Sequence, residues 1–341
     1  MKFLGKSCKA NNQNPSVLFF AGFLFLILSA ILSLLLGSTK LSIAEILDII
    51  KNGSSGSAGE RILLYVRLPR TVACLVCGAA LAVSGAVIQA VLNNRLASPS
   101  IIGVNSGAGL AVTVCIASGL YGGWALSAFA FLGAFLAVLL VSGGARRWGA
   151  SRGTVILLGV ALNSLLGAFT DTIVTLIPTV GVMSNDFKIG DFSSVTLPLV
   201  SPALIIVSIT LVVLLTLTNQ LDILTLGDDT AKSLGLNTRL LRTLFLLLAA
   251  LLAGCAVSIA GLLSFVGLIV PHAVRRMVGS AHRHLLPLCA LLGAGFVCLC
   301  DTIARTAFAP YEIPVGIIMA FLGAPFFVFI LIRGKGGHRN A

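Results

Sequence analysis

The segment DILTLGDDTAKSLGLNTRLLR, residues 222–242, is a polar island between two long apolar runs. Within it, Asp228 can cap a short helix, and Gly235 can end that helix in the left-handed conformation. A helix of about two turns is marginally stable alone, because its nucleation costs more than so few hydrogen bonds return. The island therefore predicts either an ordinary solvated loop with good caps or a short docking helix, with Asp228 and Asp229 offered to a basic surface.

The composition on both sides of the island is that of a membrane protein. Of 341 residues, 57% are hydrophobic and 10% are charged, and the mean hydropathy is +1.07, which leaves too few charges to cover a soluble globule. The net charge of +12 does not indicate nucleic-acid binding, because the cations are scattered between apolar runs. Cys74 and Cys77 have metal-ligand spacing but no second ligand pair, so we predict helix packing and no metal site.

Apolar runs of spanning length predict an all-α membrane protein. They lie near residues 17–37, 69–91, 101–119, 123–143, 154–177, 199–218, 239–260, 285–304 and 313–332. A shorter run, GLLSFVGLIVP (261–271), starts with glycine and ends with proline, and it predicts a short or broken helix that returns the chain across the bilayer. The fold class is therefore a polytopic bundle of about ten transmembrane helices in a single domain over residues 1–341.

The distribution of cations predicts the orientation of this bundle. With about ten crossings and both termini in the cytoplasm, 16 of the 23 Lys and Arg residues fall on the cytoplasmic side. The cytoplasmic parts are then a tail over 1–16, the segment 222–238 and a tail over 333–341. On the outer side, Ser42 to Ile50 has the spacing of an amphipathic helix that lies on the membrane surface.

Two arginines begin the second span on the outer side, in the sequence RLPR (67–70). Pro69 suits a helix start, and Arg67 and Arg70 can project into an outer vestibule, to which Arg305 adds a third cation. Their guanidinium groups suit carboxylates of a partner protein. They also suit a role as interfacial anchors that reach to the headgroups, and the residues alone leave both interpretations open.

Four segments, taken together, resemble the permease subunits of bacterial ABC importers for iron-siderophores, haem and cobalamin, the FecCD-type family. They are RLPRTVACLVCGAALAVSGAVIQAVLNN (67–94), LGDDTAKSLGL (226–236), FVGLIVPH (265–272) and YEIPVGIIMAFLGAPFF (311–327). The resemblance extends over nearly the whole chain, from Arg61 to Arg333. Each motif is weak alone, and their order makes the combination specific.

The resemblance implies a permease of the bacterial cytoplasmic membrane that is not itself an enzyme. A second permease chain, identical or related, would form the central pathway with it. A pair of ATPase subunits would bind the cytoplasmic face and carry the ATP and Mg²⁺, and a soluble substrate-binding protein would dock on the outer face. The chain itself would bind no cofactor and no metal. Its cargo would be a ferric siderophore, with haem or cobalamin as alternatives.

Matching residues transfer the family's roles to this chain. The coupling helix that meets the ATPase would comprise Leu226, Gly227, Asp228, Asp229, Ala231, Leu234 and Gly235. The outer arginines Arg67, Arg70 and Arg305 would meet acidic residues of the binding protein.

The gate near the cytoplasm would use Asn94 and Leu96, which match the family's Asn-Pro-Leu turn. Arg95 replaces the usual proline of that turn, and Ser98 replaces a usual acidic residue. These departures leave the local geometry of the gate open.

A proton-coupled carrier is the alternative from another class, because Asp171 and Asp301 are acidic residues inside predicted spans. Arg305 lies one turn after Asp301 and favours a local ion pair there, while the role of Asp171 stays open. A membrane enzyme ranks third. The histidines within residues 272–284 lack the spacing of a zinc site, and the chain has no Gly-x-x-x-x-Gly-Lys-Ser/Thr motif for ATP.

Overall fold

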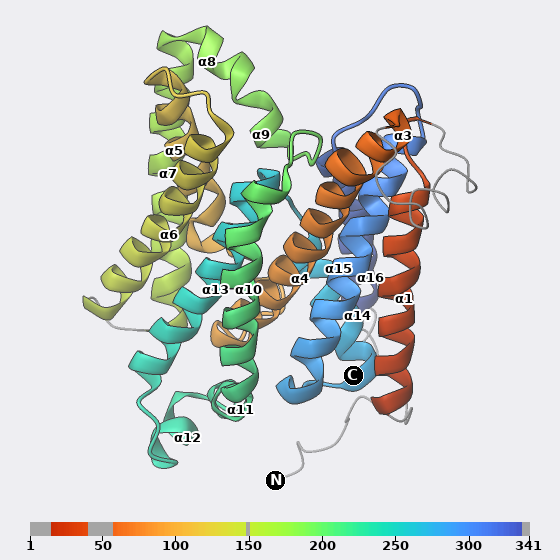
Figure 1. Ribbon diagram of the computed structural model, residues 1–341. Coiled ribbons are helices and arrows are strands. Elements are labelled where there is room, and N and C mark those ends of the chain that lie inside the picture. Colours follow the sequence, from red (N-terminus) through yellow and green to blue (C-terminus); the bar gives the residue numbers. More distant parts are fainter. Residues whose placement is uncertain (1–14, 40–56, 148–150, 336–341) are drawn as a thin grey trace.

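The computed structural model describes residues 15–39, 57–147 and 151–335, and all regular elements within these ranges are helices (Figure 1). Seven helical stretches are long and apolar enough to cross a membrane. They are α1 (Pro15–Leu35), the continuous helix Ala58–Val91, α6 (Gly123–Arg147), α7 (Arg152–Leu176), α10 (Leu197–Thr216), α13 (Thr238–Ala260) and α15 (His282–Thr306).

Three further helices belong to the described bundle: α5 (Val104–Ala117), α14 (Val266–Val278) and α16 (Val315–Lys335). The continuous helix comprises α3 (Ala58–Arg61), η1 (Ile62–Arg67) and α4 (Leu68–Val91). The all-helical membrane fold predicted from the sequence is confirmed. The expected surface helix Ser42–Ile50 lies outside the described residues, as do most of both predicted tails.

The two ends of the bundle have different short elements (Figure 1). At one end lie α3, α8 (Pro178–Met183), α9 (Asn185–Ile189) and the loop 307–314. At the opposite end lie the start of α1, α11 (Thr218–Thr225) and α12 (Asp228–Ser233). Following the orientation predicted from the cations, we call these the outer end and the inner end.

Helix α4 is the central helix of the bundle, and nearly all of its residues are buried. Small residues let its neighbours approach closely: a Cβ atom on Gly85 would lie 2.0 Å from the carbonyl oxygen of Gly267 in α14. A Cβ on Gly78 would lie 2.3 Å from the carbonyl oxygen of Gly293 in α15. Because lipid supplies little hydrophobic drive between helices, such backbone contact is a main source of packing energy in a membrane.

The short run 261–271 contains the break that the sequence predicts. Helix α13 ends at Ala260, and α14 starts at Val266 after Gly261 and Phe265, which have φ angles of 71° and 67°. The proline at the end of this apolar run does not end the helix. Pro271 lies inside α14, which continues to Val278.

Helix α14 tolerates Pro271 because α4 supplies the missing hydrogen bond. Proline has no N–H to donate to the carbonyl four residues earlier, which is that of Gly267. Gln89 of α4 donates from Nε2 to this oxygen at 3.0 Å. A backbone carbonyl at membrane depth needs such a partner. The side-chain amide of Gln89 therefore allows α14 to extend past the proline.

Helix α5 begins later than the apolar run that predicted it. Residues Pro99–Ile102 form the short 3-10 helix η2, and Gly103 follows with a φ of 95°. This left-handed residue separates η2 from α5, whose first residue is Val104.

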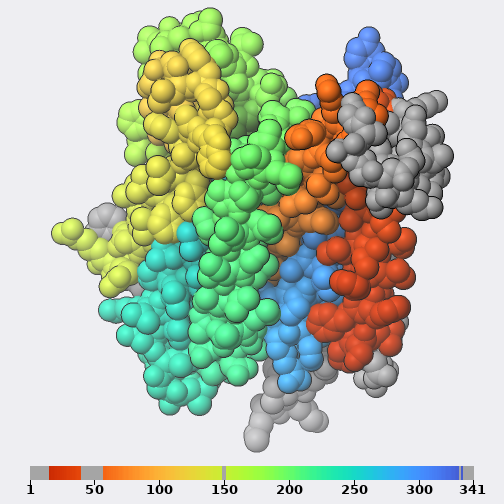
Figure 2. Space-filling model, viewed as in Figure 1, coloured from red at the N-terminus to blue at the C-terminus, as the bar shows by residue number. Residues whose placement is uncertain are grey.

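Figure 2 shows a groove between α10 and α1, with parts of α4 and α15 at its floor. The groove holds a cavity of about 440 Å³, lined by apolar side chains and by Ser208. Its walls come from membrane-spanning helices and present no charged group. A cavity of this kind can hold acyl chains but offers no convergent polar chemistry, so we look for the functional site at the two ends of the bundle.

Candidate functional site

The polar island folds into α11, a turn and α12 at the inner end. Gly227, with a φ of 116°, is the N-cap residue of α12, and no side chain caps this end. The prediction that Asp228 caps the helix is therefore wrong. Asp228 is the first helical residue, and its carboxylate turns to Arg242 of α13 instead. A guanidinium outcompetes backbone N–H groups as a partner because the hydrogen bonds between two charged groups are the stronger ones.

The other end of α12 closes as the sequence predicts. Gly235 has a φ of 81°, and its N–H donates to the carbonyl of Lys232 at 2.9 Å. The N–H of Leu236 donates to the carbonyl of Ala231 at 3.0 Å, which completes the double hydrogen bond of a glycine-ended helix.

Helix α12 presents a mixed apolar and acidic surface at the inner end. Ala231 is fully buried and anchors the helix, whereas Leu226 and Leu234 are 64% and 58% exposed. The side chain of Asp229 is fully exposed and lies 3.9 Å from Lys232. Two exposed leucines beside a fully exposed carboxylate are a surface suited to a protein partner.

The carboxylate of Asp228 fixes α12 to the bundle. Arg242 donates from Nη2 to both of its oxygens, at 2.7 and 2.9 Å. Nη2 of Arg152, from α7, lies 3.5 Å away and also donates to the carbonyl of Leu224 in α11 at 2.9 Å. Partial burial by itself raises the pKa of the Asp228 carboxyl, but Arg242 and Arg152 outweigh it and hold the pKa below its ordinary value. Asp229, and not Asp228, is therefore the carboxylate available to a partner.

A second pair of residues fixes α11. Asp222 accepts a hydrogen bond from the backbone N–H of His282 at 3.1 Å, and its carboxylate also bonds to Nδ1 of the same histidine. His282 is the first residue of α15. The segment around α12 is thus attached to α7, α13 and α15 by charged groups.

The expected gate turn follows α4 at the inner end. Asn94 accepts the N–H of Leu96 through its side-chain Oδ1 at 2.9 Å, which is a local turn that needs no proline. The turn is therefore ordered with Arg95 in the place of the family's proline. Leu96 is 42% exposed and borders a small cavity together with Phe265 and Phe326. The structure does not test gating by Asn94 and Leu96, which stays a prediction.

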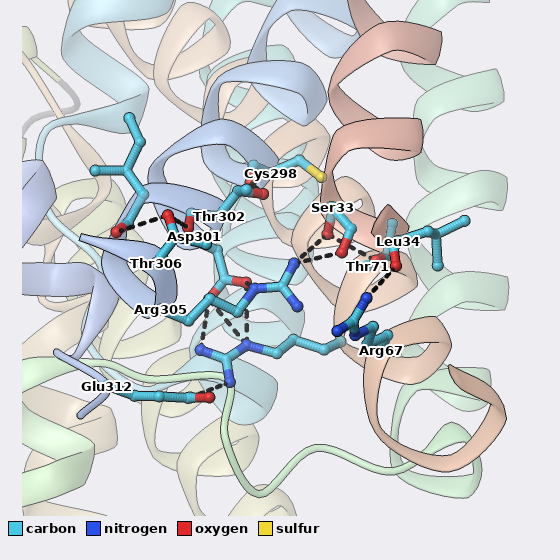
Figure 3. A network of polar contacts seen from close by, with 12 residues as sticks. Ser33, Leu34, Arg67, Thr71, Cys298, Asp301, Thr302, Arg305, Thr306 and Glu312 are labelled. Carbon is cyan, nitrogen blue, oxygen red and sulfur yellow. Dashed lines mark hydrogen bonds and ion pairs between the residues drawn. The ribbon is translucent and has the colours of Figure 1, made fainter. Parts of the chain in front are cut away.

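The three outer arginines are buried, and Figure 3 shows the network that holds them. Arg70 donates from Nε and Nη2 to Asp301 at 2.9 to 3.0 Å, and from Nη1 to Glu312 at 2.7 Å. Arg305 lies with Nε 3.3 Å from Asp301 and donates from Nη2 to the backbone oxygen and hydroxyl of Ser33, both at 2.7 Å.

Arg67 occupies the carboxyl end of α1. Its Nη1 donates to the carbonyls of Leu34 and Leu35, both at 2.7 Å, where a helix has unpaired carbonyls that favour a cation. Arg67, Arg70 and Arg305 are each 3% exposed or less, so the expectation that they project into an outer vestibule is wrong. Their intramolecular partners explain the burial. Whether they take part in docking a binding protein is not tested by these contacts.

The two intramembrane carboxylates have opposite surroundings. Asp301 is fully buried between Arg70 and Arg305, which confirms the predicted ion pair with Arg305. Asp171 is exposed on α7, on the same helical face as Ser164 and Thr175. Among the described residues, no group of three His, Cys, Asp or Glu side chains is placed to hold a metal ion.

Sequence reasoning missed three of these contacts. Gln89 could have been suspected, because a buried glutamine in an apolar span requires a partner and a proline inside a helix frees a carbonyl. The contacts of Arg152 with Asp228 and of Asp222 with His282 join residues far apart in the chain, and no local pattern signals them.

The helical bundle, with its exposed short helix at the inner end, is that of an integral membrane permease of the ABC transporter class. The chain aligns with an inward-facing conformation of a protein assigned as a metal-chelate type ABC transporter, with a TM-score of 0.80 and 30% identity over 94% of this chain and 99% of that one. The model of the FecCD transport family matches residues 25–333, and the chain belongs to this family.

Curated relatives agree with this family. The chain is 38% identical to the uncharacterized ABC transporter permease protein YvrB of Bacillus subtilis, over 96% of this chain and 97% of the relative. It is 36% identical to the hemin transport system permease protein HmuU of Yersinia pestis, over 92% and 95% of the two chains. It is also 36% identical to the vitamin B12 import system permease protein BtuC of Yersinia pseudotuberculosis, over 82% and 84%.

Proposed function

We propose that this chain is the permease subunit of an ATP-driven importer for a large metal chelate, with a ferric siderophore as the leading cargo and haem or cobalamin as alternatives. The observation that carries the proposal is α12, an exposed short helix whose base is attached to three spanning helices through Asp228 and Asp222. A helix mounted in this way can pass a displacement to the bundle. Relatives that transport hemin and vitamin B12 support the chelate class of cargo.

In this proposal a pair of ATPase subunits binds the inner end and contacts Leu226, Asp229 and Leu234, whose side chains are exposed there. ATP and Mg²⁺ belong to those subunits. A second permease chain, identical or related, completes the pathway, and both termini lie in the cytoplasm of a bacterium. ATP binding and hydrolysis change the separation of the two coupling helices and so shift the population between outward-open and inward-open states.

A substrate-binding protein docks on the outer end in the same proposal. Arg67, Arg70 and Arg305 are buried in this conformation, so they order the outer ends of α1, α4 and α15 from within. For one of these arginines to bind a carboxylate of the binding protein, it has to give up one of its present partners within the chain. Glu312 is the candidate for exchange because its side chain is one-third exposed, whereas that of Asp301 is fully buried.

Of the two carboxylates that the proton-coupled alternative would use, Asp301 belongs to this network of buried arginines. Asp301 accepts hydrogen bonds from Arg70 and lies within ion-pair distance of Arg305, so its carboxylate already has two structural partners inside the bundle.

The test is uptake by the reconstituted complex in proteoliposomes. We expect accumulation of the chelate only with the ATPase, ATP and Mg²⁺ present, and transport that persists without the ATPase would reject the proposal. A second measurement fixes the orientation: a cysteine placed at Asp229 in intact cells should react only after the membrane is made permeable. Labelling of that cysteine from outside would be equally decisive against it.

A further inference from the structure

The inner end contains a polar cavity of about 210 Å³ that the transport mechanism above does not use. It lies where the end of α4, the gate turn, the end of α11 and the connection from α14 to α15 meet. The residues that matter for its chemistry are Gln89, Asn94, Arg95, Arg275 and His282. These residues lie up to 193 positions apart in the chain, so that only the fold brings them together.

The lining of this cavity contains two arginines, Arg95 and Arg275, and no carboxylate. Arg95 and Arg275 repel each other, and neither has a carboxylate within 4.0 Å among the residues that the structure describes. The contact of Arg275 that the structure gives is with a neutral group, the side-chain oxygen of Gln89. Two guanidinium groups that share a half-enclosed space without an acid are costly unless an anion joins them.

His282 provides an independent sign of a missing ligand. His282 is one of the residues that line the cavity, its side chain is 3% exposed, its Nδ1 is bonded to Asp222, and its Nε2 is buried without a hydrogen-bond partner. A buried polar atom without a partner costs about 1 to 3 kcal/mol, so native structures seldom retain one that no ligand or water satisfies. Bonded at Nδ1, the ring can accept a hydroxyl at Nε2 or, when protonated, donate to an oxyanion.

The remaining donor of the cavity comes from the gate turn. Asn94 uses its side-chain oxygen to accept the N–H of Leu96, which leaves its amide nitrogen as the donor. The cavity therefore combines two guanidinium forks, one amide donor and one imidazole nitrogen that can meet either a hydroxyl or an oxygen. A tetrahedral anion with several oxygens and a titratable hydroxyl matches this set, and a single flat carboxylate does not supply enough acceptors for it.

We propose that this cavity binds a phosphate group and that the bound phosphate links the gate turn to α14 and α15. The phosphate comes either from the cytoplasm as free phosphate or from the headgroup of an anionic lipid, since the cavity lies at the inner end of the membrane-spanning helices. The binding site stands on the geometry alone. Its consequence for transport, a gate turn held against α14, rests on the proposed function.

The experiment uses the full chain, purified in a maltoside detergent that contains no phosphate. Inorganic phosphate is titrated against sodium chloride of equal ionic strength, and the thermal midpoint of unfolding is followed, because a ligand that binds only the folded state raises this midpoint in a saturable way. The variants are Arg95→Gln, Arg275→Gln and, as the matched control, Arg276→Gln. Arg276 follows Arg275 in the same helix and carries the same charge, but it is exposed and does not line the cavity.

We expect phosphate to stabilise the parent chain and Arg276→Gln in a saturable way. In Arg95→Gln and Arg275→Gln the affinity for phosphate should be at least about tenfold weaker, which is equivalent to about 1.4 kcal/mol of binding free energy. Should Arg275→Gln fail to fold because it loses Gln89, Arg95→Gln decides alone, since Arg95 is exposed and outside any helix. A short-chain phosphatidic acid, whose headgroup is a phosphate monoester, is added to the same samples to test the lipid source, and competition between it and phosphate supports the shared site.

Two results would overturn the proposal. One is the absence of saturable binding by both probes up to about 10 mM, which is weaker than a built site of this charge should give. The other is an equal loss of affinity in Arg276→Gln, which would show that net charge and not this cavity attracts the anion. Both are measured without the ATPase or any transport, so their failure is separate from failure of the proposed function.

Discussion

Replacing Asp228 by asparagine should loosen α12 without unfolding the bundle. The substitution keeps the size of the side chain and removes the charge that Arg242 and Arg152 share. Asp229→Asn is the matched control, because it makes the same chemical change one residue later on a side chain that is fully exposed and has only a distant lysine nearby. The pair of variants separates attachment of α12 to its own chain from any role in docking.

The expected magnitude follows from the two unequal partners. Ion pairs between exposed groups contribute at most about 1 kcal/mol, whereas removing the partner of a fully buried charge costs about 3 to 5 kcal/mol. Here the carboxylate is 35% exposed and the guanidinium of Arg242 is 4% exposed, so solvent screens one member and not the other. We expect about 1 to 2 kcal/mol for Asp228→Asn and close to zero for Asp229→Asn, and 1 to 2 kcal/mol corresponds to a factor of about 5 to 30 in a local equilibrium.

Hydrogen exchange of the reconstituted permease measures this equilibrium, because amides of a loosened helix exchange faster in proportion to the open population. Peptides covering residues 226–236 should exchange about 5 to 30 times faster in Asp228→Asn, while peptides from the middle of α4 should keep the parent rate. Equal exchange in Asp228→Asn and the parent chain would refute the anchoring role of the carboxylate. So would the same acceleration in Asp229→Asn, since that residue makes no contact with Arg242.

Four further outcomes follow from the same contacts. Gln89→Leu leaves the carbonyl of Gly267 without its partner and should destabilise the α4–α14 contact by about 1 to 3 kcal/mol, measured as faster hydrogen exchange of α14. Gln89→Glu keeps an acceptor for Arg275 but loses the donor to Gly267, so it should show a similar defect. Glu312→Gln should accelerate exchange in the loop 307–314 and leave the folding of the bundle intact, since a pair with one exposed member contributes up to about 1 kcal/mol. Asp171→Asn should leave ATP-driven uptake in place without a proton gradient, and abolished uptake with intact ATPase activity would favour proton coupling instead. Finally, Arg242 and Arg152 lower the pKa of Asp228. The stabilisation of α12 by this carboxylate should therefore be complete above the ordinary pKa of about 4 and should be lost as the pH falls through the lowered pKa. Hydrogen exchange of α12, corrected for its intrinsic pH dependence, should not change between about pH 6 and 8.

The membrane bundle was predictable because its signals are local. A run of about 20 apolar residues is a sufficient sign of a spanning helix, whatever it later contacts. Gly235 was predictable for a similar reason, since a glycine after a short polar helix favours the left-handed closure that the structure contains. The break after α13 also had a local sign in the glycine at position 261.

The partners of the charged residues were not predictable, because they depend on how distant helices meet. Arg70 lies 231 residues from Asp301, and no spacing rule relates them. The same limit explains why Asp228 was taken for a cap: it has a suitable sequence for capping, but Arg242 approaches from the next helix and forms the stronger bond. The continuation of α14 past Pro271 was not predictable for the same reason, because the side chain that compensates for the proline, Gln89, is on another helix.

Helix α4 contributes a residue to the arginine network at the outer end and another to the contact with α14 at the inner end. Arg70 and Gln89 are both residues of α4, 19 positions apart in the sequence, which places them about 28 Å apart along an α-helix. At the outer end Arg70 binds α15 through Asp301, and at the inner end Gln89 binds α14 through the carbonyl of Gly267. A buried helix can tilt or shift but cannot stretch. If α14 moves and keeps its bond to Gln89, α4 has to shift or tilt with it, and we expect the contacts of Arg70 at the other end of α4 to change as a result.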